Sequence, residues 1–261
     1  MQQKHADHRL LATWAAVALL VVVCAAVAGL WRQCSASPAG RPQLTTHPLD
    51  IVRDDWGQVQ LMADWPSGGE PQLADSLRAW IVMRLTDGAC SLTDSLAASQ
   101  QISAAADSLL RFMQEMGVGD CVARYRHRLS LTCQTDYVVN YTDSMSVDLC
   151  GAHGLENNFC VSFDRLTGQP LRLSLIFTPS DTLESRLLTL IGRHIRPEHV
   201  RPTVMPVHEP SLQADGVLFA YERYETAPYA DGQPEALIPY AELAELLTDE
   251  LRSRIVATQK N

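Results

Sequence analysis

The stretch Arg124–Asp164, RYRHRLSLTCQTDYVVNYTDSMSVDLCGAHGLENNFCVSFD, decides the fold class of this 261-residue chain. Polar and apolar residues alternate over residues 124–132, over 136–149 and again over 158–164. This alternation is typical of half-buried strands, and short connections between such strands indicate antiparallel pairing. We therefore expect a three-stranded antiparallel meander. The solvated face of its first strand carries three arginines: Arg124, Arg126 and Arg128.

Segments on both sides of the meander complete an α+β pattern. Residues 58–65 alternate and predict an earlier strand, whereas 71–86 and 93–116 carry apolar residues at helical spacing. The later predicted elements are a helix that follows Pro179–Thr182 and runs to about Arg196, strands over 216–224 and 236–238, and a helix over 240–247. Because strands and helices are segregated, we predict an α+β fold. Its antiparallel sheet has about five to six strands and is packed by helices on one face.

The N-terminal part carries a segment of membrane-spanning length. Leu10–Trp31 contains no charged residue, and its 22 residues would span roughly 30 Å as a helix. A signal peptide ending at Ala26-Val27-Ala28 and an uncleaved signal anchor both fit, and the length favours the anchor. A lipoprotein signal is disfavoured because Val23 precedes Cys24. Either way we expect a cell-envelope protein, membrane-anchored with its domain outside the cytoplasm, or exported if the signal is cleaved.

The predicted organisation has four parts. Residues 1–9 form a short cytoplasmic N-terminus and residues 10–31 form the membrane segment. Residues 32–50 are rich in Ser, Pro, Ala and Gly and predict a linker. Residues 51–261 then form one α+β domain.

Charge and motifs exclude several function classes. The net charge of −9 and the absence of a Lys/Arg cluster make nucleic acid an unfavourable partner. The chain contains no C-x-x-C, G-x-S-x-G, H-E-x-x-H, P-loop or dinucleotide fingerprint. We therefore expect no metal, no cofactor and no serine nucleophile.

Five of the seven cysteines fall in the predicted domain: Cys90, Cys121, Cys133, Cys150 and Cys160. An exported chain tends to pair four of them, whereas buried reduced thiols are the alternative. Cys133 and Cys150 lie near the ends of neighbouring predicted strands, and Cys160 lies on the next one. Pairing across strands is therefore plausible, but the sequence leaves the partners open.

Two blocks resemble one extracytoplasmic bacterial domain. The run Cys150–Gly154 (CGAHG), followed by Asp164 and Gly168, resembles the pattern GGAHG…FD…TG. The run Tyr224–Gly232 (YETAPYADG), closing on Ile238-Pro239-Tyr240, resembles YEIAPYAAG…IPY. This pattern is similar to the sensor domain of RsiV-type anti-sigma factors and to the non-catalytic N-terminal module of PdaC-type peptidoglycan deacetylases.

The resemblance covers roughly Ile51–Leu247 and departs from the pattern at two positions. Cys150 replaces the first glycine of GGAHG, and Thr226 replaces the usual isoleucine. The nine residues before the membrane segment are too few to hold a sigma factor, and no deacetylase domain follows. The resemblance therefore implies a ligand-binding module whose partner is a lysozyme-like protein or peptidoglycan.

The candidate residues each admit two interpretations. His153 is a possible general base with Asp164 or Glu225, or a structural residue in a turn where Gly151 and Gly154 permit positive φ. The second block offers Tyr224, Glu225, Pro228, Tyr229 and Gly232 either as a ligand-binding loop or as packing against the sheet edge.

The sequence favours a non-enzymatic cell-envelope protein that binds a protein or glycan ligand. One alternative is an envelope structural protein, and the other is a cell-wall glycan hydrolase that uses His153. We expect no enzymatic activity because no catalytic motif accompanies this histidine.

Overall fold

The computed structural model describes residues 42–88, 95–116 and 121–258. The predicted membrane segment at 10–31 and most of the predicted linker lie outside the described residues. Among the helices that are described, none combines the length and the apolar character needed to cross a bilayer.

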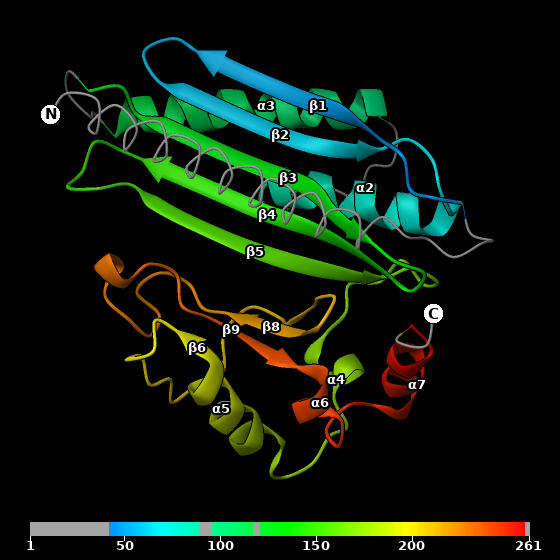
Figure 1. The fold of residues 1–261 in the computed structure, drawn as a ribbon. Helices are drawn as coiled ribbons and strands as arrows, with labels where there is room; N and C mark the ends of the chain where they lie inside the picture. Colours follow the sequence, from blue (N-terminus) through cyan, green and yellow to red (C-terminus); the bar gives the residue numbers. More distant parts are fainter. Residues whose placement is uncertain (1–41, 89–94, 117–120, 259–261) are drawn as a thin grey trace, which may run out of the picture.

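The first half of the described chain forms a five-stranded sheet, which Figure 1 shows in blue to green. Its strands, in spatial order, are β1 (Thr46–Asp54), β2 (Gln58–Pro66), β3 (Arg124–Gln134), β4 (Val138–Asp148) and β5 (Leu155–Asp164). The pairs β3–β4 and β4–β5 are antiparallel, so the predicted meander is confirmed.

The pair β2–β3 is parallel, and the prediction of a wholly antiparallel sheet is wrong at this point. Parallel neighbours need a long crossover connection, usually a helix. Here the helices α2 (Pro71–Leu85) and α3 (Ser95–Glu115) make that connection and lie on the same face of the sheet (Figure 1). Both helices were predicted from their apolar spacing, and that prediction is confirmed.

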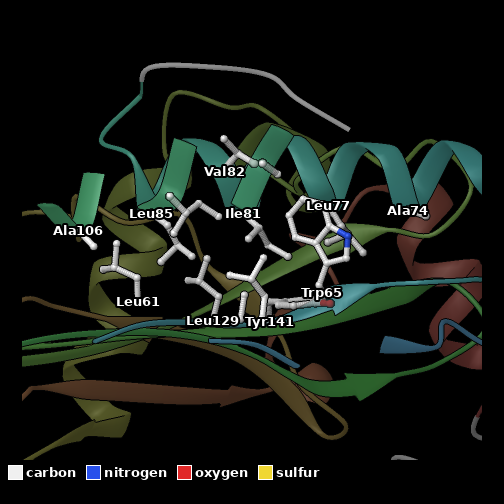
Figure 2. Packing of buried hydrophobic residues seen from close by; sticks show 14 of the residues in the cluster. Leu61, Trp65, Ala74, Leu77, Ile81, Val82, Leu85, Ala106, Leu129 and Tyr141 are labelled. Atoms are coloured by element: carbon white, nitrogen blue, oxygen red, sulfur yellow. The ribbon is translucent and has the colours of Figure 1, made fainter. Parts of the chain in front are cut away.

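The core of this half lies between α2 and the sheet. Figure 2 shows Leu77 and Ile81 pointing from the helix toward Leu61, Leu129 and Tyr141 on the strands. All five side chains are almost fully buried. The apolar face of α2, which repeats at helical spacing, therefore packs on the apolar face of the alternating strands.

The second half forms a separate four-stranded antiparallel sheet, so the expectation of a single common sheet is wrong. Its spatial order is β6 (Ile195–Arg196), β9 (Glu235–Pro239), β8 (Gly216–Ala220) and β7 (Ser211–Leu212). Helix α5 (Leu183–His194) packs against this sheet and buries Leu187 and Ile191. Two-residue strands such as β6 and β7 carry no readable period, which is why the sequence did not reveal the second sheet.

Three short helices complete the second half: α4 (Leu173–Ile176), α6 (Tyr240–Leu243) and α7 (Asp249–Thr258). The predicted helix over 240–247 is interrupted, because α6 stops after one turn and α7 begins again beyond Thr248. The hydroxyl of Thr248 accepts a hydrogen bond from the backbone N–H of Leu251 at 3.4 Å, as a helix-capping residue does.

The folded part begins earlier than the predicted boundary at residue 51. Strand β1 starts at Thr46, and Leu44 is already buried. The side chain of Arg165 is fully buried here and donates hydrogen bonds to the carbonyl oxygens of Pro42 (2.6 Å) and Thr135 (2.7 Å). The carboxylate of Glu70 lies 3.3 Å from its Nε and balances its charge.

A small buried polar network joins the two sheets. The amide of Asn140 on β4 donates to the backbone carbonyl of Leu212 on β7 at 2.8 Å. The hydroxyl of Ser162 on β5 donates to the side-chain oxygen of Asn140 and accepts from the backbone N–H of Leu212, both at 2.8 Å. The backbone of the short strand β7 is therefore held by side chains of the first sheet.

Candidate functional site

Two loops that are far apart in the sequence meet at one end of the molecule. The turn between β4 and β5 and the connection between β8 and β9 lie at the same end in Figure 1. His153 of the turn has its Nε2 2.8 Å from the hydroxyl of Tyr224 in the connection. Its ring stacks on Tyr229 with centroids 4.0 Å apart and planes 19° from parallel. The structure thus brings together three of the predicted ligand-binding residues. We call His153, Tyr224, Tyr229 and the neighbouring Arg223 the aromatic surface.

Each ring nitrogen of His153 has a hydrogen-bond partner within the protein. Its Nδ1 lies 3.0 Å from the carbonyl oxygen of Gly154. A carbonyl oxygen only accepts, so Nδ1 carries a hydrogen, and in the neutral ring Nε2 then accepts from the hydroxyl of Tyr224. Both ring nitrogens of this exposed histidine are therefore occupied within the protein.

Arg223 contacts the ring of Tyr229 and was missed by sequence reasoning. Its guanidinium carbon lies 4.8 Å from the centroid of the Tyr229 ring, which is a cation–π distance. Its Nε donates to the carbonyl oxygen of Glu156 at 2.6 Å, and its backbone N–H donates to the side-chain oxygen of Asn157 at 3.1 Å. A cation next to Tyr224 was the only signal that the sequence offered.

The connection is fastened along the edge of the first sheet. Gln233 accepts from the backbone N–H of Asn158 and donates to its backbone carbonyl oxygen, both at 2.8 Å. β5 is the outer strand of its sheet, so this amide takes the place of a neighbouring strand. The aromatic surface is therefore anchored to both sheets.

The backbone of the connection is bent at two positions. Tyr224 has a φ of 71°, and Gly232 has a φ of 81°. A bulky residue in the left-handed region is strained, and it persists only where the surroundings hold it. Pro228 precedes the short 3-10 helix η1 (Tyr229–Asp231).

The carboxylate of Glu225 helps to keep the bent backbone of this connection in place. Its carboxylate accepts hydrogen bonds from the backbone N–H groups of Glu222 (2.7 Å) and Val207 (3.1 Å). The side chain is thus used within the protein, and among the described residues no hydrogen bond or ion pair joins it to His153.

The turn between β4 and β5 is held by a disulfide. Cys150 is bonded to Cys121, has a φ of 63° and donates its N–H to the side chain of Asp148 at 2.9 Å. The expectation of positive φ at Gly151 and Gly154 is wrong, because Cys150 takes that conformation. Gly154 is needed for a close approach instead, since an added Cβ would lie 3.1 Å from the carbonyl oxygen of Val147.

The disulfide resolves one open question of the sequence. Cys150 pairs with Cys121, which precedes β3, and not with a cysteine on a neighbouring strand. Cys133 and Cys160 carry no disulfide bond, and Cys90 lies outside the described residues. Disulfides form and persist in oxidising compartments, so this bond indicates an extracytoplasmic domain.

Asp164 and Gly168 lie at the opposite end of β5, about 30 Å from the His153 turn by strand rise. The carboxylate of Asp164 accepts from the N–H groups of Leu166 (2.9 Å) and Thr167 (2.8 Å) and from Arg254 (2.8 Å). Burial would raise its pKa, but these hydrogen bonds hold the pKa of Asp164 below its usual range. Gly168 has a φ of 67° and packs against α2. His153 and Asp164 therefore share no site.

The comparisons with known proteins agree with this architecture. The model of the family "Protein of unknown function (DUF3298)" matches residues 209–241, which contain β8, the connection and β9. A DUF3298-family protein of Bacteroides fragilis NCTC 9343 has a similar structure, with a TM-score of 0.63 and 16% identity. The similarity covers 82% of this chain and 99% of that chain. The chain has the fold of that protein.

A second solved structure agrees. A DUF3298-family protein of Pseudomonas aeruginosa PAO1 gives a TM-score of 0.55 and 19% identity, over 81% of this chain and 97% of that one. No curated protein matches the chain. The family model and the second of the two resembling blocks fall on the same segment, which supplies three of the four residues of the aromatic surface: Arg223, Tyr224 and Tyr229.

Proposed function

We propose that this is a non-enzymatic cell-envelope protein whose extracytoplasmic domain binds a protein or glycan ligand through the aromatic surface. The observation that carries the proposal is the stack of His153 and Tyr229 beside the exposed Tyr224, whose side chain stays 56% exposed in a strained backbone conformation. Strain held at an exposed residue is common at ligand-binding sites.

The chemistry of this surface suits recognition. Tyrosine offers rigid apolar area with one polar end, and it loses little conformational entropy on binding. Here the hydroxyl of Tyr224 is already fixed by His153, and the ring of Tyr229 contacts both the imidazole of His153 and the guanidinium of Arg223. Such a preorganised surface meets the apolar face of a sugar ring or an apolar side chain of a protein at low entropic cost.

The surroundings of His153 argue against catalysis. A general base needs a free nitrogen within reach of the substrate and a group that orients it. Both nitrogens of His153 already have partners, Glu225 holds two backbone amides, and Asp164 lies at the far end of β5. The hydrolase alternative therefore has no acid–base pair to use among the predicted residues.

The disulfide between Cys121 and Cys150, together with the apolar segment at 10–31, supports an envelope location. A signal anchor would tether the domain to the membrane and leave the aromatic surface accessible. The resemblance to RsiV- and PdaC-type domains supplies two ligand candidates: peptidoglycan and a lysozyme-like protein.

Co-sedimentation with purified sacculi and capture on immobilised lysozyme test the proposal. We expect one of the two to retain the domain, and Tyr224→Ala to weaken that retention at least tenfold, as truncation of an aromatic anchor does. The matched control is Leu166→Ala, which removes an exposed apolar side chain at the opposite end of β5. Equal retention of both variants would move the site elsewhere. No retention by either ligand would leave the structural-protein alternative.

A further inference from the structure

A cavity of about 710 Å³ lies away from the aromatic surface, under helix α3. Its roof is one face of this helix, from which Ala104, Ser108 and Phe112 line it at helical spacing. Its sides are the C-terminal end of α2 and the strands β3 and β4, which contribute Tyr125 and Met145. This volume falls within the range of small-molecule sites.

Two residues on the floor of the cavity, His127 and Arg84, are joined by the buried carboxylate of Asp143, which does not itself line the cavity. His127 and Asp143 are only 3% and 4% exposed. The Nε2 of His127 lies 2.7 Å from one carboxylate oxygen of Asp143, and the Nε of Arg84 donates to the other at 2.7 Å. Burial would raise the pKa of Asp143, but its interactions with His127 and with Arg84 hold this pKa below its usual range.

His127 and Arg84 still have hydrogen-bonding atoms that Asp143 does not use. The carboxylate of Asp143 accepts from Nε2 of His127, so Nε2 carries a hydrogen and the lone pair of the neutral form of the ring lies on Nδ1. Among the described residues Nδ1 has no hydrogen-bond partner, although His127 is nearly all buried and lines the cavity. Arg84 also lines the cavity, and its terminal N–H groups are not used by Asp143. Buried polar groups in native proteins are almost always hydrogen-bonded.

The charges around the cavity select against an anionic ligand. Asp87 lines the cavity and Asp143 is hydrogen-bonded to the lining residues His127 and Arg84, so two negative charges stand against the single guanidinium of Arg84. Burial first, and then the charge of Asp143, raises the pKa of Tyr125 on the cavity wall. An acceptor on His127 and donors on Arg84 together match a hydroxyl, which accepts and donates one hydrogen bond each.

Much of the remaining wall is apolar. Leu109 and Phe112 line the space from α3, and Met145, the cross-strand partner of His127 on β4, adds an apolar side chain beside the polar group. The methionine sulfur accepts from the hydroxyl of Tyr125 at 3.8 Å, so this tyrosine adds little further polarity. The cavity thus has one polar end and an apolar body.

We propose that this cavity binds a small uncharged amphiphile, with an apolar chain or ring along α3 and a hydroxyl group between His127 and Arg84. The site shares no residue with the aromatic surface, so it stands independently of the function proposed above. The hydroxyl donates its hydrogen to Nδ1 of His127 and accepts from the guanidinium, which completes the buried network without adding a charge.

Calorimetric titration of the folded domain with decan-1-ol and with decanoate, at one fixed near-neutral pH, tests this assignment. We expect saturable one-to-one binding of the alcohol, at least tenfold tighter than binding of the carboxylate. Equal or tighter binding of decanoate would overturn the choice of an uncharged head group. Binding of neither probe would overturn the site.

Matched variants locate the binding. Ala104→Trp fills the cavity from an exposed position of α3 and should weaken binding of decan-1-ol at least tenfold. Gln114→Trp adds the same ring on the same helix outside the cavity lining and should leave the affinity unchanged. His127→Leu removes the acceptor and should bring the alcohol and decanoate to within about threefold of each other. Since this variant can also unfold the domain, Ala104→Trp decides the location; unchanged affinity in that variant would contradict the proposal.

Discussion

The two sheets bury different kinds of side chain. The five-stranded sheet encloses the charged residues Asp143 and Arg165 and the imidazole of His127. Around the four-stranded sheet, no charged side chain of the described residues is buried, and apolar residues such as Leu187 and Phe219 fill the core. Helices cover both sheets, so the difference lies in the chemistry of the cores and not in their architecture.

This difference teaches where each half is vulnerable. A buried charge is tolerated only with partners, and each of the three buried groups has them. The second half relies instead on close backbone approach and apolar contact, as at Gly216, where an added Cβ would lie 2.2 Å from the carbonyl oxygen of Ile238. Removal of a hydrogen-bonding partner should therefore lower the stability of the first half, and a methyl group added at a close backbone contact should lower the stability of the second half.

The largest expected effect follows from Arg165→Met. This change leaves the carbonyl oxygens of Pro42 and Thr135 and the carboxylate of Glu70 without their donor, and should lower the free energy of unfolding by about 4 kcal/mol. Denaturant titration measures it. Arg126→Met, on the exposed face of β3, should change the same quantity by less than about 0.5 kcal/mol. Equal effects would mean that burial of Arg165 does not matter.

Gly216→Ala tests the second half. The added methyl group must push β8 away from β9, and we expect a loss of about 3 kcal/mol in the free energy of unfolding. The control is Gly192→Ala in α5, where no atom lies within 4 Å of the new Cβ. That substitution should raise stability by about 0.5 to 1 kcal/mol, because alanine is the better helix former. A neutral Gly216→Ala would show that the sheet adjusts freely.

Removal of the disulfide should cost roughly 3 kcal/mol. Cys121 and Cys150 are 29 residues apart, and a closed loop of that length restricts the unfolded chain by about this amount. Thermal unfolding of the variant with both cysteines replaced by serine measures the loss. A reducing agent should destabilise the wild type but not this variant. An equal response of both proteins would point to another reducible bond.

Acid should weaken the first half through Asp143. Its folded-state pKa lies below the unfolded value of about 3.9, so its ionised form stabilises the protein above that pH. This contribution is lost as the pH falls through the folded-state pKa. We expect Asp143→Asn to be less stable at neutral pH, with a shallower fall of the free energy of unfolding below pH 5. Asp181→Asn, on an exposed turn, should retain the wild-type slope.

The smallest expected effect is a gain. The hydroxyl of Thr226 is buried and has no hydrogen-bond partner among the described residues. Thr226→Val keeps the shape and removes the unsatisfied group, so the free energy of unfolding should rise by about 1 kcal/mol. Thr248→Val is the matched control, because that hydroxyl donates to Leu175 and accepts from Leu251. It should lower stability by about 1 kcal/mol. A destabilised Thr226→Val would show that the hydroxyl has a partner.

The sequence predicted the first sheet better than the second for a physical reason. Strands β3 to β5 have ten or eleven residues each, long enough for alternation to appear, and α2 and α3 carry helical spacing. The parallel pairing of β2 with β3 could not be read locally, because it joins segments separated by two helices. The strands β6 and β7 have two residues each, and their pairing depends on tertiary contacts such as that of Leu212 with Ser162.

The candidate site was predicted in part. Family resemblance marked His153, Tyr224 and Tyr229, and the structure places them in contact. The inward role of Glu225 depends on a backbone bend that no local pattern specifies. The cavity under α3 was not anticipated, since in the sequence His127 is only one residue of the alternating segment 124–132. Its pairing with Asp143 becomes visible only when β3 and β4 are set in register.

The buried guanidinium of Arg165 has a mechanical consequence. Pro42 lies four residues before β1, and its carbonyl oxygen accepts a hydrogen bond from the guanidinium of Arg165. Strand β1 then pairs in antiparallel register with β2. If residues 10–31 tether the domain to a membrane, a pulling force on that tether reaches the contact between Arg165 and Pro42 before it reaches β1. It is carried into the turn after β5 and the start of α2, where Arg165 and Glu70 lie. The aromatic surface lies at the other end of β5, about 30 Å from that contact by strand rise.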